Sequence, residues 1–274
     1  MPAISIQNFS YAYTTHQRKA LDNINLTIED GSFTVLLGPS GAGKTTLCLA
    51  VTGAVPHYFG GSLSGVVSIN GTMTLDSTMT DLSRTVGIVL QDYEIQLVTM
   101  TVEEEIAFNL ENLGMEDLQI MRCTQTALAA VGLTGLEKTE IASLSGGQKQ
   151  RLAIASVLAT NPSVIVLDEP SSALDPEGTK TLYKLLGQLN KQRGITILVV
   201  EHDISQVLPY ADQFVLLDNG KILQSGPPAT VLGYMWDRQA NAKALPPLWQ
   251  LKLALETNTG CQLSAWYNEH DAIT

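Results

Sequence analysis

The chain has 274 residues, 45% of them hydrophobic and 16% charged, which is ordinary for a globular protein with a substantial core. Its formal net charge of -11 argues against nucleic acid as a main partner, because phosphate backbones are bound by clustered Lys and Arg. No apolar run reaches the roughly 20 residues that span a bilayer, and the stretch MPAISIQNFSY carries no export signal. Three scattered cysteines fit a reduced, cytosolic setting.

The amino-terminal part of the chain predicts strands that lead into a glycine-rich loop. Residues 24–28 alternate apolar with polar, and FTVLLG, residues 33–38, is a short continuous apolar strand. The stretch GPSGAGKTT, residues 38–46, satisfies the pattern G-x-x-x-x-G-K-[ST]. The apolar positions of KTTLCLAVTG then predict a helix that stops at Gly53. The order of strand, loop and helix is the context that this motif requires.

The loop at residues 38–46 predicts binding of a nucleotide's phosphates. Glycines let backbone N–H groups curl around phosphate, and the N-terminus of the following helix adds positive potential. Lys44 is placed to neutralise the outer phosphates, and the Thr45 hydroxyl is placed to bind Mg²⁺. The predicted nucleotide-binding residues of the loop are Gly38, Pro39, Ser40, Gly41, Ala42, Gly43, Lys44, Thr45 and Thr46.

The middle of the chain is predicted to be helical. Apolar residues at 120, 127, 128 and 131 have the spacing of an amphipathic helix, in a region with little strand character. We interpret residues of about 92–160 as a helical insertion. It contains LSGGQKQR, residues 144–151, a second glycine turn that precedes a helix. One nucleotide does not need two such turns, so the second turn raises the question of whose phosphate it contacts.

Two apolar strands follow, and each ends in a carboxylate. VIVLDE, residues 164–169, and TILVVE, residues 196–201, flank a helix with a stripe of leucines. Buried strands that alternate with helices predict a mainly parallel sheet. Asp168 suits the ligand shell of Mg²⁺, and Glu169 suits a base that orients an attacking water. An acidic strand end that faces solvent is the simpler alternative.

The last part of the chain predicts a hairpin and an appended segment. QFVLLDNGKILQSG, residues 213–226, predicts a hairpin with Asn219-Gly220 in its turn. Prolines and all three tryptophans mark residues 227–274 as a C-terminal appendage, so that residues 1–226 form the main domain.

Together these motifs resemble those of ATP-binding-cassette (ABC) ATPases. LSGGQKQR is similar to the signature of that family, and the other marks fall in the family's order between Ser5 and Gly226. They are Tyr13, the phosphate loop, Gln91, the signature, VIVLDEP, SALD with Asp175, and His202. The resemblance implies an α/β P-loop NTPase with a RecA-like core, a β-rich N-terminal subdomain and an α-helical subdomain.

The resemblance also implies ATP as substrate, Mg²⁺ as cofactor and a role for each motif. It places Gln91 near Mg²⁺ and the lytic water, His202 at the γ-phosphate, and adenine on Tyr13 rather than on Tyr11. The catalytic residues would be Lys44, Gln91, Glu169 and His202, the metal ligands Thr45, Gln91 and Asp168, and the further nucleotide contacts Ser145, Gly146, Gly147, Gln148 and Asp175. In the family's head-to-tail dimer the signature turn contacts the nucleotide of the opposite subunit.

Longer stretches are similar to the ATPases of energy-coupling-factor (ECF) transporters, which import vitamins and metal ions. They are VPHYFGGSLSGVVSINGT, RTVGIVLQDYEIQLVTMTVEEEIAFNLENLGM and ALPPLWQLKLALETNTG. Two departures are Tyr93, where those ATPases usually carry Pro, and Ser171, where Thr is common. The resemblance implies a cytoplasmic ATPase on the inner face of the membrane, paired with a second ATPase and with an integral-membrane subunit. A soluble ABC ATPase of DNA repair or of the ribosome is the alternative, and a non-hydrolysing scaffold is a third.

The segment after Gln91 carries a prediction about coupling to the membrane subunit. Residues 91–108 are expected to form one wall of a groove between core and helical subdomains, with apolar residues and an acidic rim at Glu103, Glu104 and Glu105. Such a groove would hold an amphipathic helix that bears basic residues. Ordinary core packing with solvated glutamates is the simpler alternative.

Overall fold

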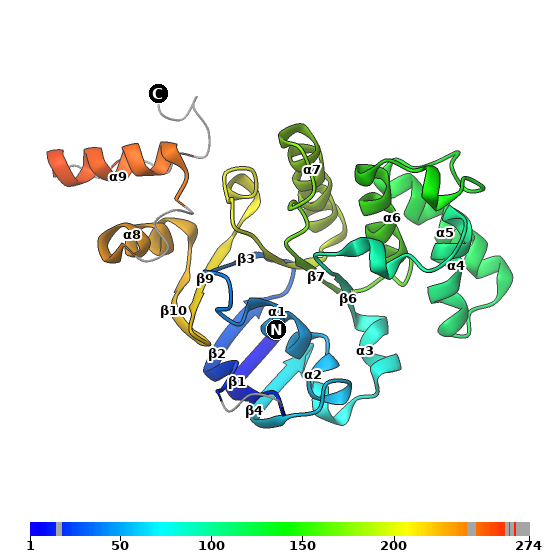
Figure 1. Ribbon diagram of the computed structural model, residues 1–274, viewed down its shortest axis with the longest axis horizontal. Helices are drawn as coiled ribbons and strands as arrows, with labels where there is room; N and C mark the ends of the chain where they lie inside the picture. The colour runs from blue at the N-terminus through cyan, green and yellow to red at the C-terminus, as the bar shows by residue number, and fades with distance from the viewer. Residues whose placement is uncertain (15–17, 240–244, 261–262, 264–265, 267–274) are drawn as a thin grey trace.

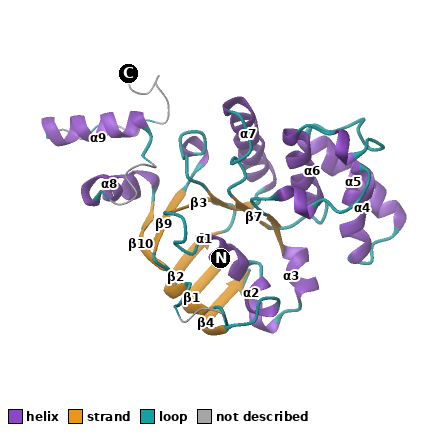
Figure 2. Ribbon diagram, in the orientation of Figure 1, coloured by secondary structure: helices purple, strands orange, loops and turns teal. Residues whose placement is uncertain are grey.

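Two β-sheets form the centre of the molecule, and helices flank them (Figures 1 and 2). The computed structural model describes residues 1–14, 18–239, 245–260, 263 and 266. The sheets separate by strand direction, one being wholly antiparallel and the other mainly parallel. This is the α/β architecture expected from the alternation of apolar strands and helices.

The antiparallel sheet is built mostly from the N-terminal part of the chain. Its strand order is β2-β1-β4-β5. Residue pairs such as Ile6 with Leu26 and Ile4 with Ile69 bring buried apolar side chains together across it. The strands are β1 (Pro2–Ala12), β2 (Leu21–Glu29), β4 (Ser62–Ile69) and β5 (Thr72–Met73). The predicted strand at residues 24–28 lies within β2, and together the strands form the expected β-rich subdomain.

The second sheet has the order β10-β9-β3-β8-β7-β6 and is parallel except for the β9–β10 hairpin. Every residue of β3, β7 and β8 is buried, which explains why these strands are continuous apolar runs without alternation. The strands are β3 (Phe33–Leu37), β6 (Val86–Val89), β7 (Val164–Asp168), β8 (Thr196–Val200), β9 (Gln213–Asp218) and β10 (Lys221–Gly226). The predicted parallel sheet and hairpin are confirmed.

Helices dominate residues 93–158, which lie beyond the β6 edge of the parallel sheet (Figure 1). The predicted amphipathic stripe of α5 is buried at Ile120, Ala127, Leu128 and Val131. The elements are the 3-10 helix η2 (Tyr93–Gln96), α4 (Val102–Asn112), α5 (Asp117–Val131), the 3-10 helix η3 (Ile141–Ser143) and α6 (Gly146–Leu158). Apolar side chains of this region share one core cluster with those of the parallel sheet.

The remaining helices cover the sheets or extend the chain beyond β10. Helix α1 (Lys44–Val51) follows β3, α7 (Pro176–Arg193) precedes β8, and α8 and α9 pack together beside β10 (Figure 1). The others are α2 (Ala54–His57), η1 (Thr74–Asp76), α3 (Met79–Thr85), η4 (Leu208–Tyr210), α8 (Pro228–Arg238) and α9 (Pro247–Thr259). The division of the chain at residue 226 stays a prediction, and residues 240–244, 261–262, 264–265 and 267–274 of the appendage lie outside the described residues.

Two elements beside the helical region, α3 and β6, were not expected from the sequence. Strand β6 is only VGIV, and its Gly87 interrupts the apolar run. A Cβ atom at Gly87 would lie 2.0 Å from Cγ1 of Val157, so the glycine permits close packing of β6 on α6. This requirement is tertiary, and no local pattern signals it.

Candidate active site

The phosphate loop connects β3 to α1 and requires glycine at positions where it approaches its own chain. Gly38 has φ +151°, and a Cβ atom there would lie 2.1 Å from the carbonyl oxygen of Leu217. Gly43 has φ +106°, and its Cβ atom would lie 2.6 Å from the carbonyl oxygen of Ala20. Helix α1 begins at Lys44 without a side-chain cap. The N–H groups of its first turn therefore remain available to an anion.

The Lys44 side chain folds back into this loop. It is only 5% exposed, and its Nζ donates to the carbonyl oxygens of Gly38 at 2.9 Å and Pro39 at 3.1 Å. Burial lowers the pKa of the Lys44 amine, although the nearby carboxylates of Glu169 and Asp168 oppose that change. A desolvated ammonium at the mouth of the loop attracts phosphate more strongly than one in water.

Four oxygen-bearing side chains, those of Thr45, Gln91, Asp168 and Glu169, lie beside the loop. Asp168 ends β7 and is 3% exposed, so burial raises the pKa of its carboxyl group, while a hydrogen bond with Thr45 lowers it. Thr45, Gln91 and Glu169 line one cavity of about 340 Å³ together with the phosphate loop. A hydroxyl, a carboxylate and an amide oxygen are donors that suit Mg²⁺, which takes few protein ligands beside substrate phosphates. The predicted metal residues therefore fit that ion.

Glu169 and His202 are in direct contact. Nε2 of His202 lies 2.7 Å from Oε1 of Glu169, although the two residues leave different strands of the sheet. Glu169 has φ +50°, a left-handed conformation that is uncommon for a non-glycine residue. Its backbone is fixed by a bond from its N–H to the Val200 carbonyl at 3.1 Å and by a bond from the Ser172 N–H at 3.2 Å. The strained peptide thus points the carboxylate toward both His202 and the cavity.

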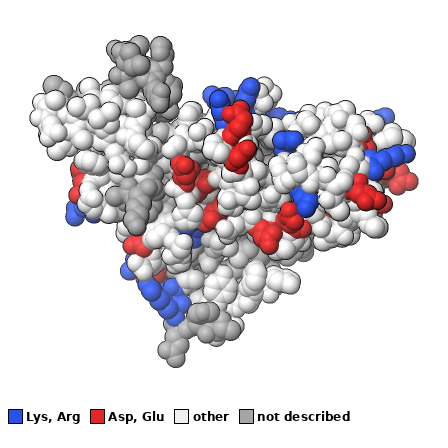
Figure 3. Space-filling model, turned by 45° about the horizontal axis from the view of Figure 1, so that its top comes forward, with Lys and Arg blue, Asp and Glu red and all other residues white. Residues whose placement is uncertain are grey.

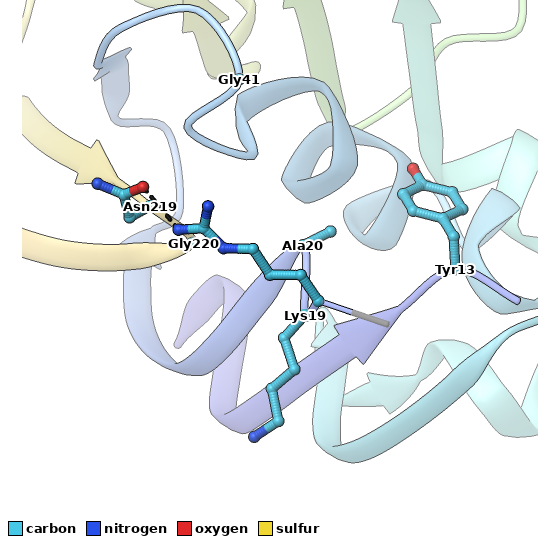
Figure 4. A pocket seen from close by; sticks show the side chains of 7 residues that line it. Tyr13, Lys19, Ala20, Gly41, Asn219 and Gly220 are labelled. Carbon is cyan, nitrogen blue, oxygen red and sulfur yellow. Dashed lines mark hydrogen bonds between the residues drawn. The ribbon is translucent and has the colours of Figure 1, made fainter. Parts of the chain in front are cut away.

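A second cavity of about 280 Å³ adjoins the first, since Ala20 and Gly41 line both (Figure 4). Tyr13 lines it and is partly exposed, whereas Tyr11 is fully buried and packs edge-on against Tyr13 with ring centroids 4.8 Å apart. Of these two tyrosines, Tyr13 is therefore the one whose ring a base in this cavity could reach. The Tyr13 hydroxyl lies 3.1 Å from that of Thr46, which ties the ring to α1.

Arg18 and Asn219 also line this second cavity and were missed in the sequence. Nη2 of Arg18 donates to Oδ1 of Asn219 at 2.7 Å, the bond drawn in Figure 4. Asn219 was predicted only as a turn residue, and Arg18 belongs to no motif. Because the two residues are 201 positions apart, no local pattern could have paired them.

The signature turn is built differently from the phosphate loop. Ser145 caps α6 by accepting from the Gln148 N–H at 3.3 Å, and the Gln148 side chain accepts from the Ser145 N–H at 2.9 Å. Nearest neighbours of a Cβ atom at Gly146 and at Gly147 would be 3.6 Å and 4.0 Å away. A Cβ atom at either glycine would therefore make only ordinary van der Waals contacts.

The predicted nucleotide-binding residues therefore fall into two groups. In the described part of the chain, neither of the two cavities beside the phosphate loop is lined by the signature residues 145–148 or by Asp175. Asp175 instead caps α7, where its Oδ1 accepts from the Gly178 N–H at 2.7 Å. Tyr93 connects the segment after Gln91 to the signature turn by donating from its hydroxyl to the Gly146 carbonyl at 3.2 Å.

A phosphate loop between a buried parallel strand and a helix, with an acidic residue ending another strand of the same sheet, defines the class of P-loop NTPases. Residues 21–172 match the family described as "ABC transporter", and the chain belongs to that family. It is the ATP-binding ATPase subunit of a transporter, and its ATP hydrolysis is coupled to transport.

Relatives support this membership over most of their length. A Pyrococcus abyssi protein, provisionally named an ABC transporter ATP-binding protein, is 42% identical over 231 residues, which are 84% of this chain and 82% of that protein. The energy-coupling factor transporter ATP-binding protein EcfA of Pediococcus pentosaceus is 37% identical over 229 residues, 83% of this chain and 80% of that protein.

Solved structures show the same fold. CbiO1 of Clostridium perfringens, part of the ABC transporter complex cbiONQ, has a TM-score of 0.77 at 32% identity and covers 91% of this chain and 98% of its own. The ATP-binding cassette MJ0796, a dimer bound to ADP and Pi, has a TM-score of 0.70 at 28% identity, with 82% and 98% covered. Among the residues described for the present chain, no helix is both long and apolar enough to cross a membrane.

Proposed function

We propose that the chain powers the uptake of a small solute, a vitamin or a metal ion, as an ATPase of an ECF-type complex on the cytoplasmic face of the membrane. The similarity to EcfA and to CbiO1 supports this branch of the family. The solute itself would be chosen by a separate membrane protein, so no residue of this chain would contact it. On the face shown in Figure 3, charged side chains of both signs lie in small groups, with no continuous basic surface among the described residues there.

The geometry supports a division of labour in ATP hydrolysis. The phosphate loop and Lys44 would hold the β- and γ-phosphates, and Tyr13 would stack on adenine. Glu169 would accept the proton of the attacking water, and His202, which contacts that carboxylate, would also contact the γ-phosphate. Thr45, Asp168 and Gln91 would hold Mg²⁺, which when bound neutralises charge on the phosphates.

We further propose a head-to-tail dimer in which the signature turn completes the site of a second ATPase, either an identical chain or a related one. The observation that carries this proposal is the room around Gly146 and Gly147. Their own chain does not require glycine, and α6 begins there with its positive end exposed. An anion supplied by another subunit could approach this backbone closely.

A groove of about 430 Å³ lies between the core and the helical region and is the proposed docking site for a membrane subunit. The core side is lined by α3 and β6, and the helical side by Gln96, Asn109 and Ser156. Gln96 accepts from the Leu90 N–H at 2.8 Å and donates to the Ile88 carbonyl at 3.2 Å. A helix seated in this groove would therefore touch the segment that carries Gln91 into the nucleotide cavity.

The predicted acidic rim is wrong in two respects, because Glu103, Glu104 and Glu105 do not line this groove and Glu105 is not exposed. Glu105 is 3% exposed and accepts from the N–H groups of Val98 at 2.9 Å and Thr99 at 3.0 Å, so it supports a loop instead of facing a partner. Glu104 completes the capping box of α4. Three apolar residues of the segment after Gln91 are exposed: Ile95, Val98 and Met100 are 66%, 62% and 78% exposed. They are better candidates for contact with the membrane subunit.

Co-expression with a candidate membrane subunit tests the proposal. Met100→Asp should reduce the amount of membrane subunit that co-purifies with the chain by about tenfold, because a charge would be buried in an apolar contact. Leu118→Asp is the matched control, since Leu118 is 66% exposed on α5. Stimulation of the ATPase by DNA or ribosomes, and not by the membrane subunit, would overturn the ECF assignment in favour of a soluble ABC ATPase.

A further inference from the structure

Glu201 is a buried carboxylate that none of the roles above uses. It follows β8 directly and is 3% exposed. Within the part of the chain that the structure describes, no Lys, Arg or His forms an ion pair with it. Burying an ionised carboxylate without a cation is costly, so such a group persists only where several donors surround it.

The donors to Glu201 come from the segments that carry the proposed catalytic pair. The Ser171 hydroxyl donates to it at 2.9 Å and the Ser171 N–H at 3.3 Å. The hydroxyl of Tyr183 also donates to it. Ser171 lies two residues after Glu169, and His202 follows Glu201 directly. The Glu201 carboxylate therefore connects the segment after Glu169 to the residue that precedes His202.

Tyr183 anchors this arrangement to the core. It lies on α7, is fully buried, and belongs to the main hydrophobic cluster. Burial raises the pKa of its hydroxyl, and burial likewise raises the pKa of the Glu201 carboxyl group. The buried Tyr183 ring thus fixes the Glu201 carboxylate on the side of the core, and the carboxylate in turn holds Ser171.

We infer that Glu201 is a positioning residue for ATP hydrolysis, which ties the Ser171 segment to the residue before His202 so that Glu169 and His202 stay in contact. The inference rests on the proposed roles of Glu169 and His202. The left-handed backbone of Glu169, at φ +50°, is of a kind that persists only where its surroundings hold it. The bonds from Ser171 to Glu201 provide such a restraint two residues away.

A purely structural role makes a different prediction. Replacing a buried polar group by one of similar shape changes the stability of the fold, but it leaves kcat per folded molecule unchanged. A positioning role predicts a lower kcat at unchanged KM for ATP, since a small displacement of the catalytic pair weakens the transition state and not the binding of ATP.

The experiment measures kcat and KM in the complete chain, with the folded fraction of each variant determined by circular dichroism. Glu201→Ala should lower kcat about tenfold or more, and Glu201→Gln should recover part of the loss because the amide oxygen still accepts from Ser171. Ser171→Ala should lower kcat about threefold, and Ser171→Thr, which keeps the hydroxyl, should restore it. Ser172→Ala is the control, since its side chain is exposed beside Ser171.

A double-mutant cycle decides whether Glu201 acts through His202. In the His202→Ala background, Glu201→Ala should cost much less than it does alone, because the contact it maintains is already lost. Fully additive losses, or a normal kcat per folded molecule in Glu201→Ala, would overturn the inference. If Glu201→Ala does not fold, Tyr183→Phe removes a single donor and should lower kcat about threefold, and a normal kcat in it and in Ser171→Ala would have the same meaning.

Failure of the proposed site is a separate outcome. Normal hydrolysis in both Glu169→Gln and His202→Ala would remove the proposed catalytic pair itself. Impaired hydrolysis in those variants together with normal hydrolysis in the Glu201, Ser171 and Tyr183 variants would overturn only the role of Glu201.

Discussion

The phosphate loop, residues 38–46, and the signature turn, residues 144–148, both place glycines at the start of a helix, α1 in one case and α6 in the other. In the phosphate loop, a Cβ atom at Gly38 or Gly43 would collide with backbone oxygens of the same chain, and both residues have positive φ. In the signature turn, Gly146 and Gly147 have room for a side chain. One helix start has no side-chain cap, and the other has a complete capping box.

This difference indicates where the requirement for glycine comes from. At Gly38 and Gly43 of the phosphate loop the chain itself excludes a side chain, so its own packing requires glycine there. Around the signature turn the chain excludes nothing, and its cap is satisfied internally. A ligand brought by another molecule would account for an unobstructed helix start at that position. Four experiments test this comparison between the phosphate loop and the signature turn.

The largest change in activity is expected for Glu169→Gln. This variant tests both turns, because it should bind ATP at the phosphate loop and then dimerise through the signature turn. Hydrolysis should fall by roughly 10²- to 10⁴-fold, because the amide keeps the shape of the carboxylate but cannot accept a proton. ATP should still bind to the phosphate loop and should then hold two chains together at the signature turns. Phosphate release and size-exclusion chromatography with ATP measure the two parts. Near-normal phosphate release would remove Glu169 from its proposed role.

Exchanging glycine for alanine in each turn tests the comparison directly. Gly43→Ala should reduce the free energy of unfolding by about 3 kcal/mol, because the methyl group meets the Ala20 carbonyl and φ is unfavourable. Gly146→Ala should change that free energy by less than about 1 kcal/mol. Urea unfolding followed by circular dichroism measures both. Equal losses of stability would mean that the two turns do not differ in the way described.

A second pair of variants separates ATP binding by the monomer from ATP-driven dimerisation. Lys44→Ala should weaken ATP binding to an isolated monomer by about 10- to 100-fold, since a charged hydrogen-bond donor is lost. Ser145→Arg should leave monomer binding unchanged and prevent ATP-driven dimerisation, because the added bulk lies in the contact. Fluorescent-nucleotide titration and light scattering report the two quantities. Similar weakening of monomer binding in both variants would contradict the head-to-tail arrangement.

The smallest effect concerns alkaline pH and the phosphate loop alone. Burial lowers the pKa of Lys44 from the ordinary value of 10.5, so the free protein loses that proton earlier than an exposed lysine would. ATP affinity of the monomer should decrease as pH rises through this lowered pKa, because phosphate binds the protonated amine. The expected decrease is smaller than that of Lys44→Ala, since only part of the population is deprotonated. An identical pH dependence in Lys44→Ala would assign the effect to another group.

Patterns that are local in the sequence predicted most of the fold. The phosphate loop was recognisable because a strand, a glycine pattern and a helix follow one another without a gap, and the β9–β10 hairpin was recognisable from Asn219-Gly220 between two apolar runs. Helix α5 was predicted from the period of Ile120, Ala127, Leu128 and Val131, all of which are buried. Strand β6 was missed because four residues with a central glycine are too short to establish a period.

The sequence predicted which residues form the candidate site, but it did not predict which of them are buried or which side chains they contact. In the run Glu103, Glu104 and Glu105 the residues are chemically identical, yet the last is buried under a loop and the second closes a helix cap. Glu201 reads in the sequence as the end of an apolar strand, and its importance comes from donors on Ser171 and Tyr183. Burial and partners of this kind are set by packing between distant segments, which propensity and periodicity do not encode.

By itself the sequence determined the class of protein, because phosphate binding needs a fixed order of glycines, Lys44 and Thr45 within a few bonds of one another. Only the tertiary structure decided that Glu169 meets His202 and that Gln91 shares a cavity with the phosphate loop. Glu169 and His202 lie 33 positions apart, and their contact exists because β7 and β8 pair in parallel and end side by side. The physical reason is that the chain specifies neighbours along the backbone through bond geometry, whereas neighbours across a sheet are specified by the burial of whole strands.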